Sequence, residues 1–183
     1  MNVADAIAAR YSCRAYRPDP VPAHAVDRLV EAVRLAPSAC NRQPWRLALV
    51  SAADARRQIV ERGFLPGIRM PWALDAPLLV VLGMARSFVT HRLGAWVSRV
   101  DYPWIDLGIA GEHLALQATE LGLATCWIGW VRPRVLRRLV GWPAAVRPVA
   151  VMAVGYAAGG AGVRPRPTDR LPSAQWVSRV GGA

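Results

Sequence analysis

The sequence predicts one domain that mixes helices and strands, of either the α/β or the α+β class. Strand-like and helix-like segments alternate along the chain, which is typical of these two classes. The run "PLLVVLGM" at 77–84 is apolar throughout, as in a strand that is buried on both faces of a sheet. A long helix that is apolar around most of its circumference is predicted over 104–122. We expect a single domain over 1–183, with its core at about 4–170 and a C-terminal extension at 171–183.

Helices and a strand are predicted in turn along the first half of the chain. A short helix at 3–10 is followed by three prolines within five residues, which forbid its continuation. Residues 23–36 have the spacing of an amphipathic helix that Pro37 ends, and its buried face is predicted to hold Val26, Leu29, Val30, Val33 and Ala36. A strand at 45–50 and a helix at 52–63, ended by Gly63, come next.

The second half continues the alternation after a mixed pattern at 84–103. Beyond the long helix we predict a strand at 123–129, a short helix at 133–141 capped by Gly141, and an interior strand at 147–156. A glycine-rich loop with an arginine pair follows, and 170–183 is expected to be weakly structured.

Composition narrows the class of protein. Hydrophobic residues make up 54% and charged residues 19% of the chain, a balance that favours burial in a dimer interface as well as in the core. No apolar run approaches the roughly 18 residues of a membrane span, and the N-terminus lacks the basic and apolar regions of a signal peptide. We therefore expect a cytoplasmic protein that does not bind a membrane.

The net charge is +11, and all 23 basic residues are arginines. The absence of lysine excludes a Walker A loop, whose lysine reaches the bound phosphates. The arginines are spread along the chain rather than gathered in one stripe. This spacing favours a basic, solvated surface over a nucleic-acid-binding domain.

Side-chain catalysis and metal binding find little support in the sequence. Cys13, Cys40 and Cys126 are widely spaced, which argues against a disulfide framework, and no pattern of metal ligands is present. No catalytic triad can be recognised in the sequence. For Cys40, a buried structural role is favoured over a role as a nucleophile. Asp106 is expected to open a helix and face its dipole rather than to pair with Asp101.

Two arginine pairs form an anion-binding pattern. Arg10 and Arg14 lie four apart around Ser12, and Arg164 and Arg166 lie two apart, so that in an extended segment they point the same way. Guanidinium groups offer planar, bidentate hydrogen bonds that match phosphate oxygens. Taken alone, four unrelated surface arginines would explain the pattern equally well.

Five segments occur in an order that resembles the nitroreductase family of FMN-dependent flavoproteins: "ARYSCRAYRPDPVP", "LAPSACNRQPWRLALV", "IDLGIAGEHLALQATELGLATCWIG", "VAVMAVGY" and "RPR". The resemblance covers roughly 4–170. It implies a three-layer α+β fold in which helices flank a central, mostly antiparallel sheet. It also implies an intertwined homodimer that holds two FMN molecules at its interface.

The resemblance assigns a cofactor-binding role to twelve residues. Arg10, Arg164 and Arg166 would hold the FMN phosphate, Ser12 would bond the phosphate or ribityl region, and Arg14 would face the pyrimidine edge of the ring. Pro37, Ser38, Ala39 and Asn41 would approach the flavin of the partner subunit, with Asn41 and Gln43 fixing the loop's shape. Trp127, Ile128 and Gly129 would lie along the ring.

The implied enzyme is an NAD(P)H oxidoreductase whose chemistry belongs to the flavin and needs no catalytic side chain. Hydride would pass from NAD(P)H to flavin N5, and a nitroaromatic, quinone or enone-like acceptor would then be reduced in a ping-pong cycle. Two alternatives are a flavin-binding or flavin-sequestering protein without turnover, and an arginine-rich nucleic-acid-binding domain.

Further residues are candidates for the substrate pocket. Arg69 and Trp72 stand where many family members place an Asn and a Lys near the ring. Trp72, Trp96 and Trp104 would line the pocket or, more commonly for large aromatics, the core or the dimer interface. His91 is either a proton donor near the substrate or an ordinary loop histidine.

Overall fold

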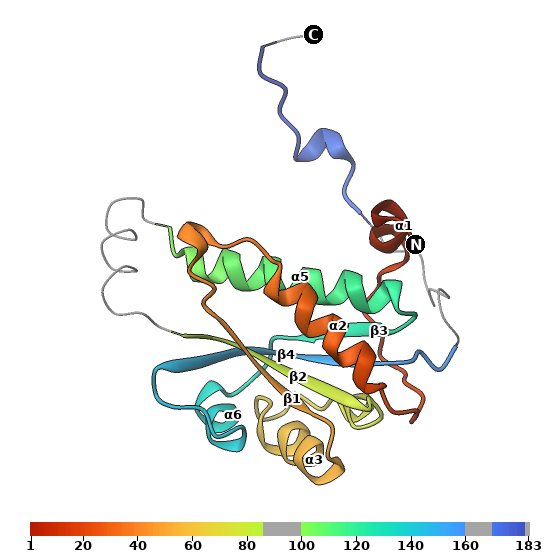
Figure 1. Ribbon diagram of the computed structural model, residues 1–183, viewed down its shortest axis with the longest axis vertical. Coiled ribbons are helices and arrows are strands. Elements are labelled where there is room, and N and C mark those ends of the chain that lie inside the picture. The colour runs from red at the N-terminus through yellow and green to blue at the C-terminus, as the bar shows by residue number, and fades with distance from the viewer. Residues whose placement is uncertain (86–99, 160–169, 182–183) are drawn as a thin grey trace.

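The computed structural model describes residues 1–85, 100–159 and 170–181, and it shows helices on both faces of a four-stranded antiparallel sheet (Figure 1). The predicted α+β class is confirmed. In chain order the elements are α1 (Val3–Ala9), α2 (Ala23–Arg34), η1 (Ala39–Asn41), β1 (Trp45–Val50), α3 (Ala53–Arg62), η2 (Pro71–Ala73), β2 (Leu78–Ala85), α5 (Tyr102–Glu120), β3 (Ala124–Ile128), α6 (Pro133–Leu139), β4 (Val146–Gly155) and η3 (Ser173–Gln175).

The sheet has the strand order β1-β2-β4-β3, and each neighbouring pair is antiparallel. The predicted apolar strand is β2, in which every residue from Leu78 to Met84 is buried. It is buried because β1 and β4 flank it in the sheet while helices cover both of its faces.

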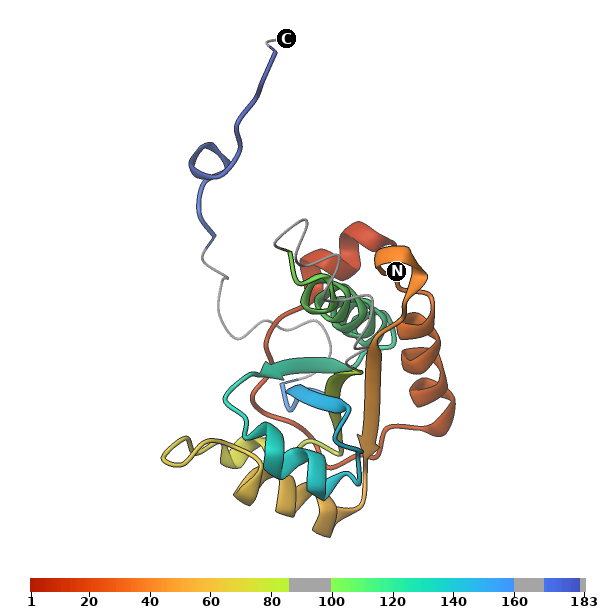
Figure 2. The same ribbon diagram turned by 90° about the vertical axis from the view of Figure 1, so that its left-hand side faces the viewer.

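Side chains alternate along β2 between two clusters of buried residues. Leu78, Val80 and Leu82 pack with residues of α2 and α5, whereas Leu79 and Val81 pack with residues of α3 and α6. This alternation is the period-2 pattern of a strand. It gives a three-layer molecule, with α2 and α5 on one side of the sheet and α3 and α6 on the other (Figures 1 and 2).

Helix α2 packs against α5 on a slightly different face from the predicted one. Leu29, Val33 and Ala36 are buried as expected, but Val30 is exposed and Ala25 is buried in its place. The prediction was wrong for Val30 because the contact with α5 follows positions four residues apart, which places Val30 at the margin of the buried face.

Helix α5 begins two residues before its predicted start, with Pro103 in its first turn and Asp101 as its N-cap residue. Asp106 therefore lies in the second turn of the helix. It is only 3% exposed, and it accepts a hydrogen bond from the backbone N–H of Ala39 at 3.0 Å. The expectation that Asp106 opens the helix and faces its dipole is wrong, because the carboxylate anchors a distant loop instead.

The outer edge of β3 is covered by the segment that follows α1. Ser12 and Thr125 form a parallel bridge, and the Cys13 N–H donates to the Thr125 carbonyl at 2.9 Å. Further on, Tyr16 bridges Ala157. The predicted anion-binding residues around Ser12 are thus attached to the sheet rather than to a free loop.

The described C-terminal residues 170–181 are all exposed, and they extend away from the layered body in both views (Figures 1 and 2). Their one helical turn is η3, in agreement with the weak structure predicted there. Across the described parts of the chain, no helix combines the length and apolar character that a membrane span requires.

Candidate functional site

Arg10, Ser12 and Arg14 come together beside Cys126 on β3. Burial raises the pKa of the Cys126 thiol, while the nearby positive charge of Arg14, a hydrogen bond with Ser12 and the charge of Arg10 act in the opposite direction. Ser12 forms its bridge with Thr125, the neighbour of Cys126, and Arg10 and Arg14 flank Ser12 in the same segment. Because Ser12 and Arg14 are exposed at this sheet edge, they are available to a ligand.

Arg10 is held in place by α5. Its Nε lies 3.5 Å from the Glu112 carboxylate, and its side chain is largely shielded from solvent. The set therefore combines an anchored guanidinium with an exposed guanidinium and an exposed hydroxyl. Such a donor set suits a phosphate, whose oxygens accept several hydrogen bonds.

Trp127, Ile128 and Gly129 form the end of β3 and the start of the following turn. The side chain of Ile128 is buried in the core below the sheet, so only its backbone can face a ligand. The Trp127 indole is 37% exposed and packs directly on Gly111 of α5. A Cβ at position 111 would overlap the ring, so glycine is what permits this close approach of helix and indole.

The loop at 37–43 has a tightly determined shape. The Gln43 N–H donates to the Ser38 hydroxyl at 2.9 Å, and the Gln43 side-chain amide donates to Asn41 Oδ1 at 2.9 Å. Cys40, Asn41 and Gln43 all have positive φ, near 50°. A non-glycine residue in this region costs on the order of 1–3 kcal/mol, and such strain gathers at functional sites.

The three parts of the site follow one another along α5. Asp106 holds the loop at Ala39, Gly111 receives Trp127, and Glu112 pairs with Arg10. Gly111 and Glu112 lie five and six residues after Asp106, which corresponds to a rise of about 8–9 Å along the helix axis. The long helix therefore serves as the common support for segments that are far apart in the sequence.

The remaining predicted residues divide into two groups. Arg164 and Arg166, together with His91 and Trp96 in the mixed stretch, lie outside the described residues. Trp72 stacks on Tyr16 with ring centroids 6.4 Å apart and packs against the core, which favours its structural interpretation. Cys40 is exposed, so the expectation of a buried structural cysteine is wrong.

Sequence reasoning missed two groups that shape the surroundings of the site. The contacts of Asp106 and Glu112 were not predicted, although acidic residues in a largely apolar helix are a usable signal. The indole N–H of Trp104 donates to Asp101 at 2.8 Å, and the Arg147 guanidinium lies 5.2 Å from its ring centroid. No sequence pattern connects Trp104 with Arg147, because they are 43 residues apart on different elements.

The cavities of the single chain only partly coincide with this site. A cavity of about 200 Å³ lies beside Arg10 and Tyr11, whereas a larger one of about 650 Å³ lies between α6 and the start of β4. The volume of a cavity does not show which ligand it binds, so we choose the candidate site by its hydrogen-bond donors. We locate the candidate cofactor site at Arg10, Ser12 and Arg14.

The layered fold defines an α+β protein, and the donors at the sheet edge together with the strained loop form its candidate binding site. Comparison with protein families identifies its family. The model of the nitroreductase family matches residues 7–64 and 63–156, so the chain belongs to the nitroreductase family.

Individual relatives agree with this membership. A protein of Methanothermobacter thermautotrophicus named NADH dehydrogenase/NAD(P)H nitroreductase is 30% identical, over 96% of this chain and 88% of the relative. An FMN reductase (NAD(P)H) of Bacillus subtilis is also 30% identical, over 85% of this chain and 66% of its own length. A nitroreductase family protein of Clostridium difficile 630 superposes with a TM-score of 0.77 at 26% identity, covering 97% and 98% of the two chains. The predicted family, the enzyme class and the FMN cofactor are confirmed at the level of the family.

Proposed function

We propose that this chain is an FMN-dependent oxidoreductase that takes hydride from NAD(P)H and reduces a nitroaromatic, quinone or enone-like acceptor in a ping-pong cycle. The observation that carries the proposal is the gathering of Arg10, Ser12 and Arg14 at the covered edge of β3. It occurs in a chain that matches the nitroreductase family over most of its length.

The donor set fits the phosphate end of FMN. Guanidinium and hydroxyl groups match the charge and the hydrogen-bond acceptors of a phosphate, and Arg10 is already oriented by Glu112. Arg164 and Arg166 would complete this set. Arg14 would face the pyrimidine edge of the ring, where a positive charge stabilises the reduced cofactor.

FMN, when bound, supplies the redox chemistry by accepting hydride and passing electrons to the second substrate. The protein's contribution is to bind and orient. The Trp127 indole, fixed on Gly111, would provide an apolar surface along the ring, and Gly129 would offer its backbone. Asp106 would hold Ala39, and with it Pro37, Ser38 and Asn41, in one position at the cofactor of the partner subunit.

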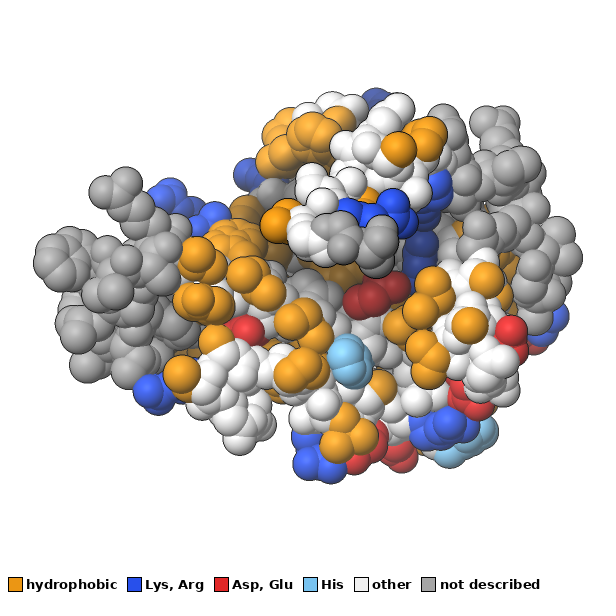
Figure 3. All heavy atoms as spheres, turned by 90° about the horizontal axis from the view of Figure 1, so that it is seen from above, with side chains coloured by type: hydrophobic (Ala, Val, Ile, Leu, Met, Phe, Trp, Pro, Cys, Tyr) orange, Lys and Arg blue, Asp and Glu red, His pale blue; other side chains and the backbone are white. Residues whose placement is uncertain are grey.

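A homodimer with FMN at its interface is part of the proposal. Large apolar side chains remain exposed on the side of the molecule formed by α1 and α5, among them Val3, Ile7, Trp104 and Ile105. Figure 3 looks onto this side and shows hydrophobic side chains spread over it around a hollow. Exposed apolar area of this kind marks interaction surfaces, and a second copy of the chain would cover it.

The decisive experiment is anaerobic reduction of the purified protein. We expect a yellow protein whose flavin absorbance is bleached by NADH or NADPH and restored when an acceptor such as a quinone or a nitroaromatic is added. A colourless protein that fails to take up FMN would contradict the proposal. Flavin that bleaches without steady-state consumption of NAD(P)H in the presence of acceptors would instead indicate a flavin-binding protein without turnover.

A further inference from the structure

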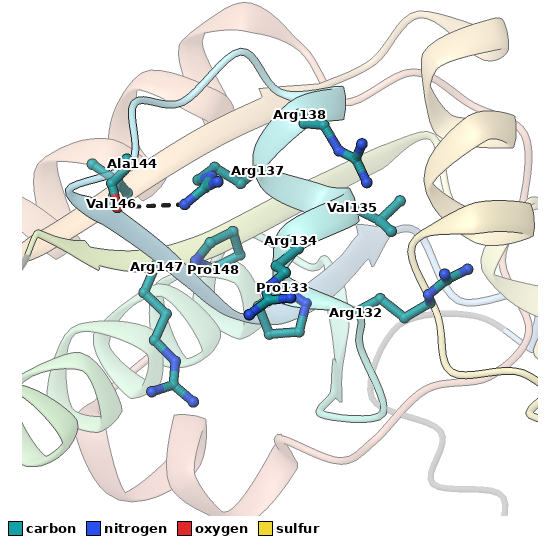
Figure 4. A pocket seen from close by; sticks show the side chains of 10 residues that line it. All are labelled: Arg132, Pro133, Arg134, Val135, Arg137, Arg138, Ala144, Val146, Arg147 and Pro148. Carbon is teal, nitrogen blue, oxygen red and sulfur yellow. Dashed lines mark hydrogen bonds between the residues drawn. The ribbon is translucent and has the colours of Figure 1, made fainter.

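The larger of the two cavities described above lies away from the proposed flavin site and is lined by arginines. It is about 650 Å³ in volume and lies between α6 and the first residues of β4 (Figure 4). Five of its ten lining residues are Arg132, Arg134, Arg137, Arg138 and Arg147. None of these belongs to the set that the family resemblance assigns to FMN.

We propose that this cavity binds a small molecule that carries two or more phosphate groups, with a nucleoside triphosphate as the representative ligand. The proposal does not rest on the function proposed above, because it concerns a different set of residues on a different part of the fold.

The positive charge at the cavity is not neutralised by the protein. The sequence contains no Asp or Glu between Glu120 and Asp169, although all five arginines lie in this interval. The ion pairs found among the described residues join other arginines to their acids. The guanidinium groups of Arg132, Arg134, Arg137 and Arg138 thus lie around α6 without a carboxylate partner in the described chain, and an anionic ligand would supply the missing charge.

The fold brings these arginines together from two segments. Arg134 and Arg138 lie four residues apart on α6, and therefore on one side of the helix. Leu136, which is fully buried, holds the helix against the sheet. Gly141, with a φ of 68°, then ends the helix and lets the chain turn back toward Arg147. Like charges at this helical spacing repel one another, so the unliganded arrangement is unfavourable and an anion would relieve it.

Some of the arginines are engaged weakly by the protein and others not at all. Arg132 and Arg137 reach backbone carbonyl groups at 3.5 Å, a long distance for a hydrogen bond. Arg147 turns toward the Trp104 ring. Within the described residues, no hydrogen bond or ion pair engages the side chain of Arg134 or Arg138. These two are the groups most available to a ligand.

The size and lining of the cavity favour a small molecule. Pockets for small ligands have volumes of about 300–1,000 Å³ and combine apolar walls with a few polar groups, and this cavity falls within that range. Pro133, Val135, Val146 and Pro148 supply the apolar part of the lining. A ligand with a flat apolar portion and a chain of phosphates would use both kinds of surface, since guanidinium groups bind phosphate oxygens in bidentate pairs.

The test is a binding measurement on the intact protein loaded with FMN, so that the flavin site is already filled. Isothermal titration with ATP, ADP, AMP and inorganic triphosphate should give one site per chain. We expect a Kd on the order of 10–100 µM for ATP and progressively weaker binding as phosphates are removed. The double variant Arg134→Gln/Arg138→Gln should weaken ATP binding at least about tenfold, because charge-assisted contacts are lost.

A matched control removes the same charge elsewhere. Arg57→Gln/Arg179→Gln alters two exposed arginines outside the cavity, and it should change the ATP affinity by less than about twofold. Circular dichroism and FMN content show that both variants are folded. The proposal is overturned if neither ATP nor triphosphate binds at about 1 mM, or if the two double variants weaken binding equally. It is also overturned if a single-stranded oligonucleotide binds more tightly than ATP and loses that affinity in the cavity variant, which would indicate a nucleic-acid surface.

Discussion

At the scale of single residues, Arg14 differs from Arg17 in a way that allows a direct test of the cofactor site. Arg14 is exposed beside Ser12 and Cys126. Arg17, three residues further on, already pairs with Asp19 at 2.7 Å and lies over the Tyr156 ring. The two arginines therefore share a segment and a charge, but only Arg17 is already engaged by neighbouring side chains in the described chain.

We predict that Arg14→Gln raises the Kd for FMN about tenfold or more, because a hydrogen bond to a charged group contributes about 1.5–3 kcal/mol. Arg17→Gln should leave the FMN affinity nearly unchanged. Quenching of flavin fluorescence on titration of the apoprotein measures both values. Equal effects of the two substitutions would show that Arg14 acts only through the overall charge.

At the scale of elements, the contact between α5 and β3 depends on the absence of a side chain at Gly111. Because a Cβ at position 111 would overlap the Trp127 ring, we predict that Gly111→Ala lowers the free energy of unfolding by about 1–3 kcal/mol, the cost of overpacking. Urea denaturation of the apoprotein measures this change. Adding Trp127→Leu should recover part of the loss, and the coupling energy follows from the double-mutant cycle. Additive effects would contradict direct packing of the two residues.

The elements themselves could be predicted from the sequence because each carries a local signal. The unbroken apolar run of β2 and the glycines that follow α3 and α6 define their positions within a residue or two. The exact set of buried residues on α2 could not be predicted. The exposure of Val30 depends on how α2 packs against α5 and not on the spacing of apolar residues within α2.

The contacts within the site could be predicted from the sequence less completely than the fold. The resemblance selected Arg10, Ser12 and Arg14, and the structure brings them together at one sheet edge. The bond from Ala39 to Asp106 spans 67 residues, and no local pattern encodes it. The arginines that line the cavity at α6 are close in the sequence, since four of them lie within 132–138, but the cavity itself depends on the turn at Gly141 that places the start of β4 beside the helix.

At the scale of the whole molecule, the exposed apolar side formed by α1 and α5 predicts self-association. Ile105, which is 49% exposed on α5, would be covered by a second copy of the chain. We predict that Ile105→Arg converts a dimer to a monomer and reduces the FMN content, since burying an unpaired charge is unfavourable. Sedimentation velocity and the flavin-to-protein absorbance ratio measure these effects.

Leu74→Arg is the control for this prediction. Leu74 is 38% exposed, and its carbonyl accepts a hydrogen bond from Arg56 of α3, which places it near the opposite layer of the molecule. This variant should remain a dimer with bound FMN. A wild-type protein that is monomeric and yet fully loaded with FMN would refute the shared site.

The attachment of the N-terminal segment to β3 and β4 also determines when the cofactor site can form during synthesis. Cys13 bonds to Thr125, Arg17 to Tyr156, and Ala158 to Ala15. Contacts between residues so far apart in the chain form late, because a long loop must close first. Arg10, Ser12 and Arg14 leave the ribosome more than 100 residues before β3 and β4, and they remain without their support until these two strands have followed. We therefore expect that a nascent chain that ends before β4 cannot retain FMN. Binding of FMN would then show that the chain has folded completely.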